Sequence, residues 1–167
     1  MRIVVMGVCG CGKSTVGRLL ARTLGLPFQD GDELHPSDNI ARMAAGVPLT
    51  DADRQGWLAA IGRRLGEAGG RRGGVVVACS ALKRAYRDQL RAAAPDLRLV
   101  YLRGDPALLA SRLAARRDHY MPASMLPSQL AALEGPGPDE GAIEIDVVHT
   151  PEAIVEMACR QLKSPHP

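Results

Sequence analysis

Gly7-Val8-Cys9-Gly10-Cys11-Gly12-Lys13-Ser14-Thr15 is the stretch of sequence that decides the fold of this chain. It fits the pattern G-x-x-x-x-G-K-[ST], in which the backbone N–H groups of a glycine-rich loop surround phosphate oxygens. Residues 2–6 before it form an apolar run of strand length, and residues 15–24 after it repeat apolar side chains at the spacing of one helix face. A strand before the loop and a helix after it are the context that the motif requires, so we predict a P-loop that binds ATP. The alternative, a glycine-rich turn with an incidental lysine, is disfavoured by these flanking elements.

The residues of the loop have different expected tasks. Lys13 would bridge the β and γ phosphates and act in catalysis, while the Ser14 hydroxyl would ligate Mg²⁺. The helix that starts at Lys13 would add the positive end of its dipole. Cys9 and Cys11 occupy variable positions, where they serve either as small filling side chains or as a redox-sensitive pair. We expect all nine residues, from Gly7 to Thr15, to contact the nucleotide.

A magnesium ion also needs an acidic partner, because the apolar strand predicted at residues 75–79 ends without an aspartate. Asp30-Gly31-Asp32 is the best candidate, since carboxylates at i and i+2 of an extended segment point the same way. We assign Asp32 to the hydroxyl of the phosphoryl acceptor and Asp30 to the magnesium shell through water. The alternative is that this segment is an ordinary polar turn.

Apolar runs and helical periods alternate along the whole chain. The predicted strands cover residues 2–6, 26–29, 75–79, 97–102 and 143–148, and the predicted helices begin near Thr15, Thr50, Leu82, Pro106 and Pro151. Strands separated by helices predict right-handed crossovers and a three-layer α/β/α fold. Residues 30–49 and 116–141 look irregular and are long for connections in a compact domain, so we expect substrate to bind there.

Length and composition exclude several classes of protein. The chain has 167 residues, 46% of them hydrophobic and 23% charged, which is typical of one globular domain spanning residues 1–167 and excludes a disordered or coiled-coil chain. A net charge of +3 without a basic tail, and only 3% aromatic residues, give no indication of nucleic-acid binding. No apolar run approaches about 20 residues and no signal peptide is visible, so we expect a cytoplasmic protein without a membrane partner. The four cysteines lack zinc spacing and are expected to be reduced.

Three longer segments, residues 30–58, 79–91 and 112–129, resemble the small P-loop gluconokinases. The sub-segments L-H-P-x-x-N, C-S-A-L-K-R-x-Y-R-D and S-Q-L are far more specific than the P-loop, and the resemblance covers nearly the whole chain. It implies ATP-dependent phosphorylation of the 6-hydroxyl of D-gluconate, a parallel sheet with strand order 2-3-1-4-5, and a cytosolic homodimer. The family usually has serines at positions 9 and 11 and proline at position 56, and often phenylalanine at position 120. None of these departures removes a charged group from the predicted site.

Gluconate is a small polyol with one carboxylate, so its pocket should offer an arginine for the acid and Asp, His or Asn for the hydroxyls. Arg54, Arg84 and Arg87 are the candidates for the carboxylate. Arg84 and Arg87 are three apart on one predicted helix and therefore share a face, although a solvated helix face would show the same spacing. Asp32 and His35 would reach the hydroxyls, and the alternative for His35 is an exposed polar position.

The resemblance also assigns the second long connection, at about residues 116–141, to a lid. Arg112 would lie against the adenine, and Arg116 would reach the γ phosphate as an arginine finger. Closure of such a lid excludes water and suppresses hydrolysis of ATP. The alternative is a helix end whose cations complement the helix dipole.

Two other functions stay open at this stage. One is a related small kinase that acts on shikimate or a nucleoside monophosphate, which the L-H-P-x-x-N segment disfavours. The other is a nucleotide-binding regulator without transfer chemistry, which leaves Asp32 and the lid arginines without a task.

Overall fold

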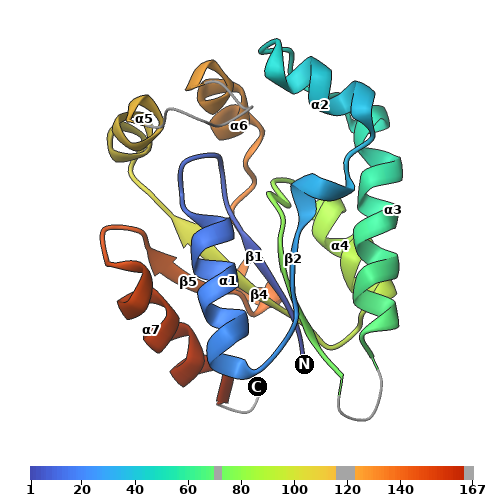
Figure 1. Ribbon diagram of the computed structural model, residues 1–167, viewed down its shortest axis with the longest axis vertical. Coiled ribbons are helices and arrows are strands. Elements are labelled where there is room, and N and C mark those ends of the chain that lie inside the picture. The colour runs from blue at the N-terminus through green and yellow to red at the C-terminus, as the bar shows by residue number, and fades with distance from the viewer. Residues whose placement is uncertain (70–72, 116–122, 164–167) are drawn as a thin grey trace.

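Five parallel strands form a single sheet in the computed structural model, which describes residues 1–69, 73–115 and 123–163 (Figure 1). The strands are β1 (Arg2–Met6), β2 (Phe28–Asp30), β3 (Val75–Ala78), β4 (Leu97–Arg103) and β5 (Ile143–Asp146). Their order is β2-β3-β1-β4-β5, and every neighbouring pair is parallel. The strand order 2-3-1-4-5 and the α/β class expected from the sequence are therefore confirmed.

Helices cover both faces of this sheet, which gives the three layers. They are α1 (Lys13–Leu24) and α7 (Pro151–Lys163) on one face, and α3 (Asp51–Glu67) and α4 (Arg84–Ala93) on the other. Side chains alternate between the faces of a strand, so Ile3 and Val5 pack with the first pair of helices while Val4 and Met6 pack with the second. A central strand that is apolar on both sides is the signature of a buried parallel sheet.

Most helix boundaries follow the expected capping signals. Thr50 and Asp53 form a reciprocal capping box at the start of α3, in which the Asp53 N–H donates to Thr50 Oγ1 at 3.2 Å and the Thr50 N–H donates to Asp53 Oδ2 at 2.8 Å. Asp105 caps α5 (Pro106–Ala114) through the Ala107 N–H at 2.9 Å. The helix expected from Leu82 begins two residues later at Arg84, with Lys83 as its N-cap.

The edge strands differ from the prediction. The second strand begins at Phe28 instead of residue 26, and Pro27, which has no N–H for the ladder, contributes only its carbonyl, to the Val76 N–H. The fifth strand ends at Asp146 instead of residue 148, because the Asp146 carboxylate accepts the Val148 N–H and turns the chain.

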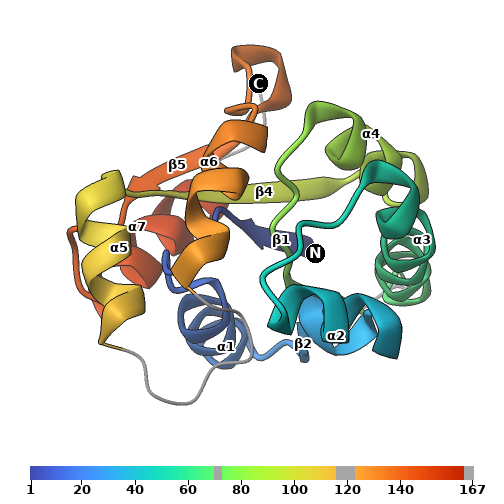
Figure 2. The same cartoon turned by 90° about the horizontal axis from the view of Figure 1, so that it is seen from above.

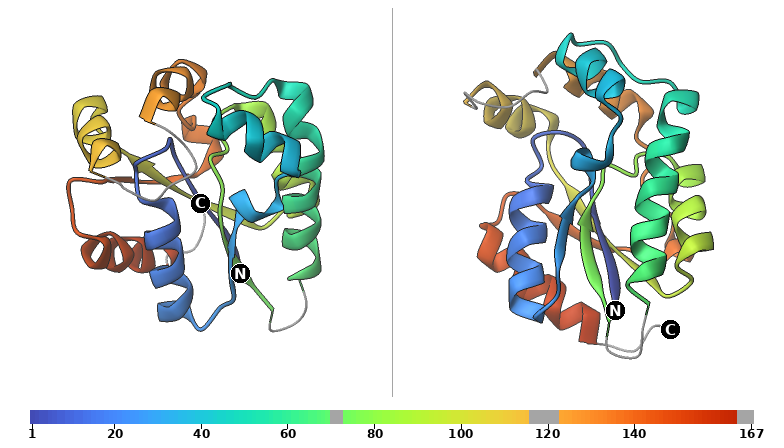
Figure 3. Two further views of the ribbon diagram at one scale, coloured as in Figure 1. Left: turned by 45° about the horizontal axis from the view of Figure 1, so that its top comes forward. Right: turned by 45° about the vertical axis from the view of Figure 1, so that its right-hand side comes forward.

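The two long connections are not irregular where the structure describes them. The first contains a 3₁₀ helix (Gly31–Leu34) and α2 (Ser37–Ala44), and the second contains α6 (Leu126–Ala132) between the 3₁₀ segments Ala123–Met125 and Pro138–Glu140. Glycines and prolines interrupt the apolar period in both connections, which hid these short helices from the sequence pattern. Seen from above, α2, α5 and α6 lie over the carboxyl ends of the strands (Figure 2). Two oblique views show the same helices above the sheet (Figure 3).

The turn after β2 makes a close contact with β3. A Cβ atom on Gly31 would lie 2.4 Å from the Ala78 carbonyl oxygen and 3.3 Å from Ile61 Cδ1. Only glycine fits in this space, and the contact fixes the path of the chain immediately before Asp32.

We expect Gly31→Ala to lower the free energy of unfolding by about 1–3 kcal/mol, because the added methyl group must push the β3 backbone aside. Gly56→Ala in α3 is the matched control, since no atom lies within 4 Å of its added Cβ. That control should stabilise the helix by up to about 1 kcal/mol. Urea unfolding of both variants measures the difference, and equal stability of the two would contradict the close contact.

Candidate active site

A pocket at the carboxyl ends of β1 and β3 brings distant parts of the chain together. It is lined by Cys9, Gly10, Gly12, Lys13, Ser14, Asp32, His35, Met43, Arg54, Ser80, Leu113 and Gln129. The P-loop, the turn after β2, α3 and α6 thus contribute to one site. Of the acceptor residues expected from the sequence, Asp32, His35 and Arg54 lie in this pocket together with P-loop residues.

The P-loop has the backbone that its glycines allow. Gly10 and Gly12 have φ angles of 82° and 88°, in the left-handed region that side chains disfavour. Helix α1 begins at Lys13 and carries no acidic residue in its first turn, so nothing neutralises the positive end of its dipole there. Lys13 Nζ donates to the Val8 carbonyl at 3.0 Å, which holds the ammonium group against the loop. The loop therefore presents N–H groups and a cation to the pocket.

The two aspartates after β2 have different surroundings. Asp32 lines the pocket, whereas Asp30 is not among the lining residues and accepts the Asp32 N–H at 3.2 Å through Oδ1. Asp30 thereby caps the 3₁₀ helix that carries Asp32. The prediction that both carboxylates face the same ligands is wrong in this respect, because the chain turns at Gly31 instead of continuing as an extended strand.

His35 is held in the pocket by α3. Its ring stacks on the buried indole of Trp57, with centroids 4.3 Å apart and an interplanar angle of 9°. Trp57 Nε1 in turn donates to the Gly31 carbonyl at 2.7 Å, which ties the aspartate turn to the same helix. Asn39, the last residue of the L-H-P-x-x-N segment, donates to the Asp53 carbonyl at 2.8 Å. The segment thus fastens the first long connection to α3, and His35 is buried instead of exposed.

The environment of His35 keeps its ring neutral. Burial lowers the pKa of His35 to about 4; the nearby Asp32 carboxylate opposes this shift, and the Arg54 guanidinium adds to it. A neutral imidazole can accept one hydrogen bond and donate another, which suits a hydroxyl group.

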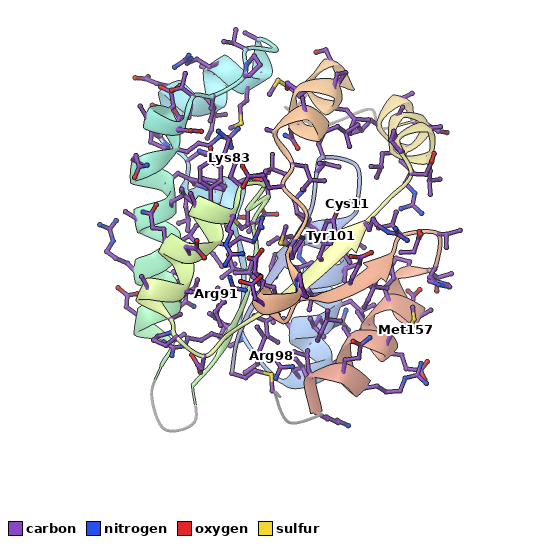
Figure 4. All side chains as sticks on the ribbon, turned by 180° about the vertical axis from the view of Figure 1, so that it is seen from behind. Cys11, Lys83, Arg91, Arg98, Tyr101 and Met157 are labelled. Atoms are coloured by element: carbon purple, nitrogen blue, oxygen red, sulfur yellow. The ribbon has the colours of Figure 1, made fainter. Side chains whose placement is uncertain are left out.

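Arg54 is the arginine that the structure places in the pocket. Its guanidinium carbon lies 6.0 Å from the ring centroids of both Trp57 and Tyr86, at the limit of a cation–π contact. The Tyr86 hydroxyl donates to the Asp51 carboxylate, which also accepts from Lys83 Nζ at 2.8 Å. Burial, followed by the hydrogen bond to Asp51, raises the pKa of Tyr86 to about 12. Figure 4 shows Lys83 at the start of α4, beside α3.

Arg84 and Arg87 are not brought to the pocket, which corrects the sequence-based expectation for them. Arg87 is fully buried, and its Nε and Nη2 atoms donate to Glu140 at 2.6 and 2.7 Å. Arg84 is exposed and bonds Asp139 at 3.1 Å through Nη1. The two arginines do point to carboxylates, but those carboxylates belong to the segment that follows α6. A solvated helix face is also wrong for Arg87.

This buried ion pair holds the backbone around it. Arg87 Nη1 donates to the carbonyls of Ala81, at 3.1 Å, and Glu134, at 2.9 Å. Ala81 has a φ of 43°, a left-handed conformation that is strained for a residue with a side chain. The hydrogen bonds from Arg87 lower the pKa of Glu140 to about 2, and Arg91 adds a second cation at 2.9 Å (Figure 4).

A second pocket adjoins the other side of the P-loop. It is lined by Gly10, Cys11, Gly12, Thr15, Val16, Arg112, His149, Pro151 and Ile154. Arg112 Nη2 donates to the Val147 carbonyl at 2.7 Å, which places Arg112 beside the segment that follows β5. This is the arrangement expected for an adenine site. Arg116 and the start of the expected lid lie outside the described residues.

Magnesium is compatible with the residues that are present. Among the described residues, no group of three or more His, Cys, Asp or Glu side chains could hold a metal by itself. Mg²⁺ usually keeps several waters and takes one or two protein ligands together with phosphate oxygens. Ser14 and Asp32 both line the P-loop pocket, so a hydroxyl and a carboxylate oxygen are available there.

Comparisons with known proteins define the family. The shikimate kinase family model matches residues 9–133. A gluconokinase of Gluconobacter oxydans is 47% identical over 162 residues, which cover 97% of this chain and 91% of that protein. The chain belongs to the gluconokinase family. The resemblance found in the sequence is thus confirmed.

Solved structures of gluconokinase relatives agree with the fold. A crystal structure of a gluconokinase from Sinorhizobium meliloti is 49% identical, with a TM-score of 0.87 over 96% of this chain and 90% of that one. A sugar kinase from Janibacter is 41% identical, with a TM-score of 0.92 over 96% and 93% of the two chains.

Several pocket residues were not identified from the sequence. Met43, Ser80, Leu113 and Gln129 line the pocket, and Trp57 and Tyr86 frame Arg54. Ser80, Tyr86 and Gln129 lie in the segments that resemble gluconokinases, which was the available signal. Trp57 is the only tryptophan of the chain, but its helical spacing indicated a core position.

We expect Arg87→Met and Glu140→Gln each to destabilise the protein by about 3–5 kcal/mol, because each leaves the other partner buried without its counter-charge. The double variant Arg87→Met/Glu140→Leu should be more stable than either single variant. Denaturant unfolding gives the three free energies. Normal stability combined with weaker substrate binding in Arg87→Met would show that Arg87 contacts substrate after all.

We also expect the His35 ring to titrate near pH 4, as measured by NMR of the imidazole resonances and assigned by their loss in His35→Gln. Unfolded histidine titrates near pH 6.5, so between pH 6.5 and 4 the unfolded state binds the extra proton. Stability should therefore fall as the pH drops through that window, and less so in His35→Gln. A midpoint at 6.5 would show that the ring is open to water.

Proposed function

We propose that this chain transfers the γ-phosphoryl group of ATP to the 6-hydroxyl of D-gluconate and forms 6-phospho-D-gluconate. The observation that carries the proposal is the single pocket in which Lys13 of the P-loop meets Asp32 and Arg54. The names of its relatives, at 47% and 49% identity, support the choice of acceptor.

The P-loop supplies the donor half of the reaction. The N–H groups of the loop and the N-terminus of α1 would hold the β and γ phosphates. Lys13 would exchange its contact with the Val8 carbonyl for phosphate oxygens. Ser14 would hold Mg²⁺, which neutralises charge on the phosphates, and Asp30 would reach the metal through water. Arg112 would lie against the adenine.

Asp32 supplies the acceptor half of the reaction. Its carboxylate would accept the proton of the 6-hydroxyl as the oxygen attacks the γ phosphorus. The new bond joins this oxygen to the γ phosphorus, the bond between the γ phosphorus and the β–γ bridging oxygen breaks, and ADP leaves. Because Asp30 caps the turn, Asp32 is held in position before substrate arrives.

Arg54 would bind the carboxylate of gluconate. It is the one lining residue with a guanidinium among the described residues, and the Trp57 and Tyr86 rings limit its movement. The neutral His35 would bond a hydroxyl of the polyol chain. Arg116 in the lid remains the proposed arginine finger.

The remaining expectations belong to the same proposal. We infer a single kinase domain that works as a homodimer in the cytoplasm and needs no nucleic acid or membrane. In the described part of the chain, the structure has no helix with the length and hydrophobicity of a membrane span.

We expect ADP release from MgATP to depend on gluconate and not on shikimate, AMP or CMP. A coupled assay with these four acceptors, and with none, measures this directly. Equal rates with and without gluconate would refute the proposal, and a rate with shikimate alone would assign the pocket to the acceptor of the wider family.

Variants in the same assay identify the residues. Asp32→Asn should lower kcat by a factor of about 100 or more, because the base is lost. Arg54→Met should raise the KM for gluconate at least about tenfold while the KM for ATP changes little, since an uncompensated carboxylate loses a charged hydrogen bond. Arg84→Met is the matched control and should leave both KM values within about twofold. The reverse ranking of the two arginines would return Arg84 to the acceptor pocket.

A further inference from the structure

Gln129 connects α6 to the phosphate-binding loop. The backbone N–H of Cys9 donates to Gln129 Oε1 at 2.7 Å, across 120 residues of sequence. Gln129 is only 6% exposed, and both residues line the P-loop pocket. A buried, neutral side chain that is bonded to the backbone of a phosphate loop has a fixed position in the site.

The chain on the C-terminal side of Gln129 is also fixed. The Glu134 N–H donates to the Leu82 carbonyl at 2.8 Å, and the Glu134 carbonyl accepts from Arg87 Nη1 at 2.9 Å. Arg87 is the residue of the buried pair with Glu140, so α6 is fastened to the start of α4. Gln129 therefore reaches the pocket from a support that is anchored on both sides of the site.

The hydrogen bond from Cys9 determines how the amide is oriented. An amide group has one oxygen, which accepts, and one nitrogen, which donates. Because the oxygen is bonded to the Cys9 N–H, the nitrogen acts as a donor on the other side of the group. Asp32, His35 and Arg54 line the same pocket, so that donor belongs to the acceptor side of the site.

We propose that Gln129 binds a hydroxyl oxygen of the phosphoryl acceptor through Nε2 while its Oε1 is held by the Cys9 N–H. This proposal rests on the proposed function and adds a specificity-determining residue to it. A neutral amide suits a hydroxyl better than a carboxylate, which has Arg54. The acceptor is thereby positioned against the same loop that holds the phosphates, which brings the two reactants into register.

The competing explanation is that Gln129 only supports the P-loop by accepting the Cys9 N–H. The two explanations differ in their dependence on the substrate. A support would act equally on every acceptor, whereas a hydroxyl ligand loses its effect when that hydroxyl is absent.

The test measures kcat/KM for the wild type and for Gln129→Met with D-gluconate and with its 2-, 3-, 4- and 5-deoxy analogues. Methionine has a similar length and offers neither donor nor a strong acceptor. We expect Gln129→Met to lose about 5- to 50-fold with gluconate, the range for a buried polar group left without its partner. With one deoxy analogue, wild type and variant should agree within about twofold.

An equal loss of kcat/KM with all five acceptors would overturn the proposal and leave Gln129 as a support of the loop. The dissociation constant for ATP gives an independent readout: it should change less than about threefold in Gln129→Met, and a larger loss would also count against an acceptor role. Ser128→Ala is the matched control on α6, because Ser128 Oγ bonds only the Met125 carbonyl among the printed contacts of the helix and does not line the pocket.

The wild-type measurements separate this proposal from the proposed function. If the wild type does not phosphorylate gluconate, the function falls whatever Gln129 does, and Gln129 as an acceptor ligand of this reaction falls with it. If the wild type is active and the loss is uniform, only the role of Gln129 is refuted.

Discussion

Parallel pairing of β1 between β3 and β4 is the constraint on which the site depends. The chain leaves β1 through the P-loop, and the strands on its two sides are reached by connections that run in opposite directions. The loop therefore lies where the order of the strands reverses, at the carboxyl end of the sheet, where α/β proteins bind their ligands. The turns after β2 and β3 end at the same edge, which brings Asp32 and Ser80 to the loop. The site follows from the topology before any side-chain contact is considered.

A second group of contacts converts this placement into a defined geometry. Trp57 binds the Gly31 carbonyl with its indole nitrogen and stacks on His35 with its ring. The same ring faces Arg54, so one residue of α3 positions three parts of the proposed acceptor site. Because the indole is buried, its single N–H needs a partner, and the aspartate turn supplies it. Stability of the core and position of the catalytic groups are therefore not separate properties here.

Local patterns predicted much of this structure, and non-local contacts account for what they missed. The P-loop, the capping box at Thr50 and the alternation of strands and helices depend on neighbours in sequence, so the sequence revealed them. Spacing also placed Arg84 and Arg87 on one helix, but it could not show that Glu140, 53 residues away from Arg87, is the partner of that residue. Gln129 was missed for the same reason, because its partner is a backbone N–H at the other end of the chain. Side chains whose partners lie far along the chain require the fold before their role can be assigned.

The strained residue beside the buried ion pair carries an evolutionary consequence. Ala81 has a left-handed backbone, and its carbonyl is held by the guanidinium of Arg87. Backbone strain of this kind costs about 1–3 kcal/mol and persists only where the surroundings enforce it. In a lineage that loses the guanidinium, alanine at position 81 keeps the strain without the restraint, whereas glycine adopts the same conformation freely. The two positions therefore form a linked pair, and drift at one of them changes which residues natural selection tolerates at the other.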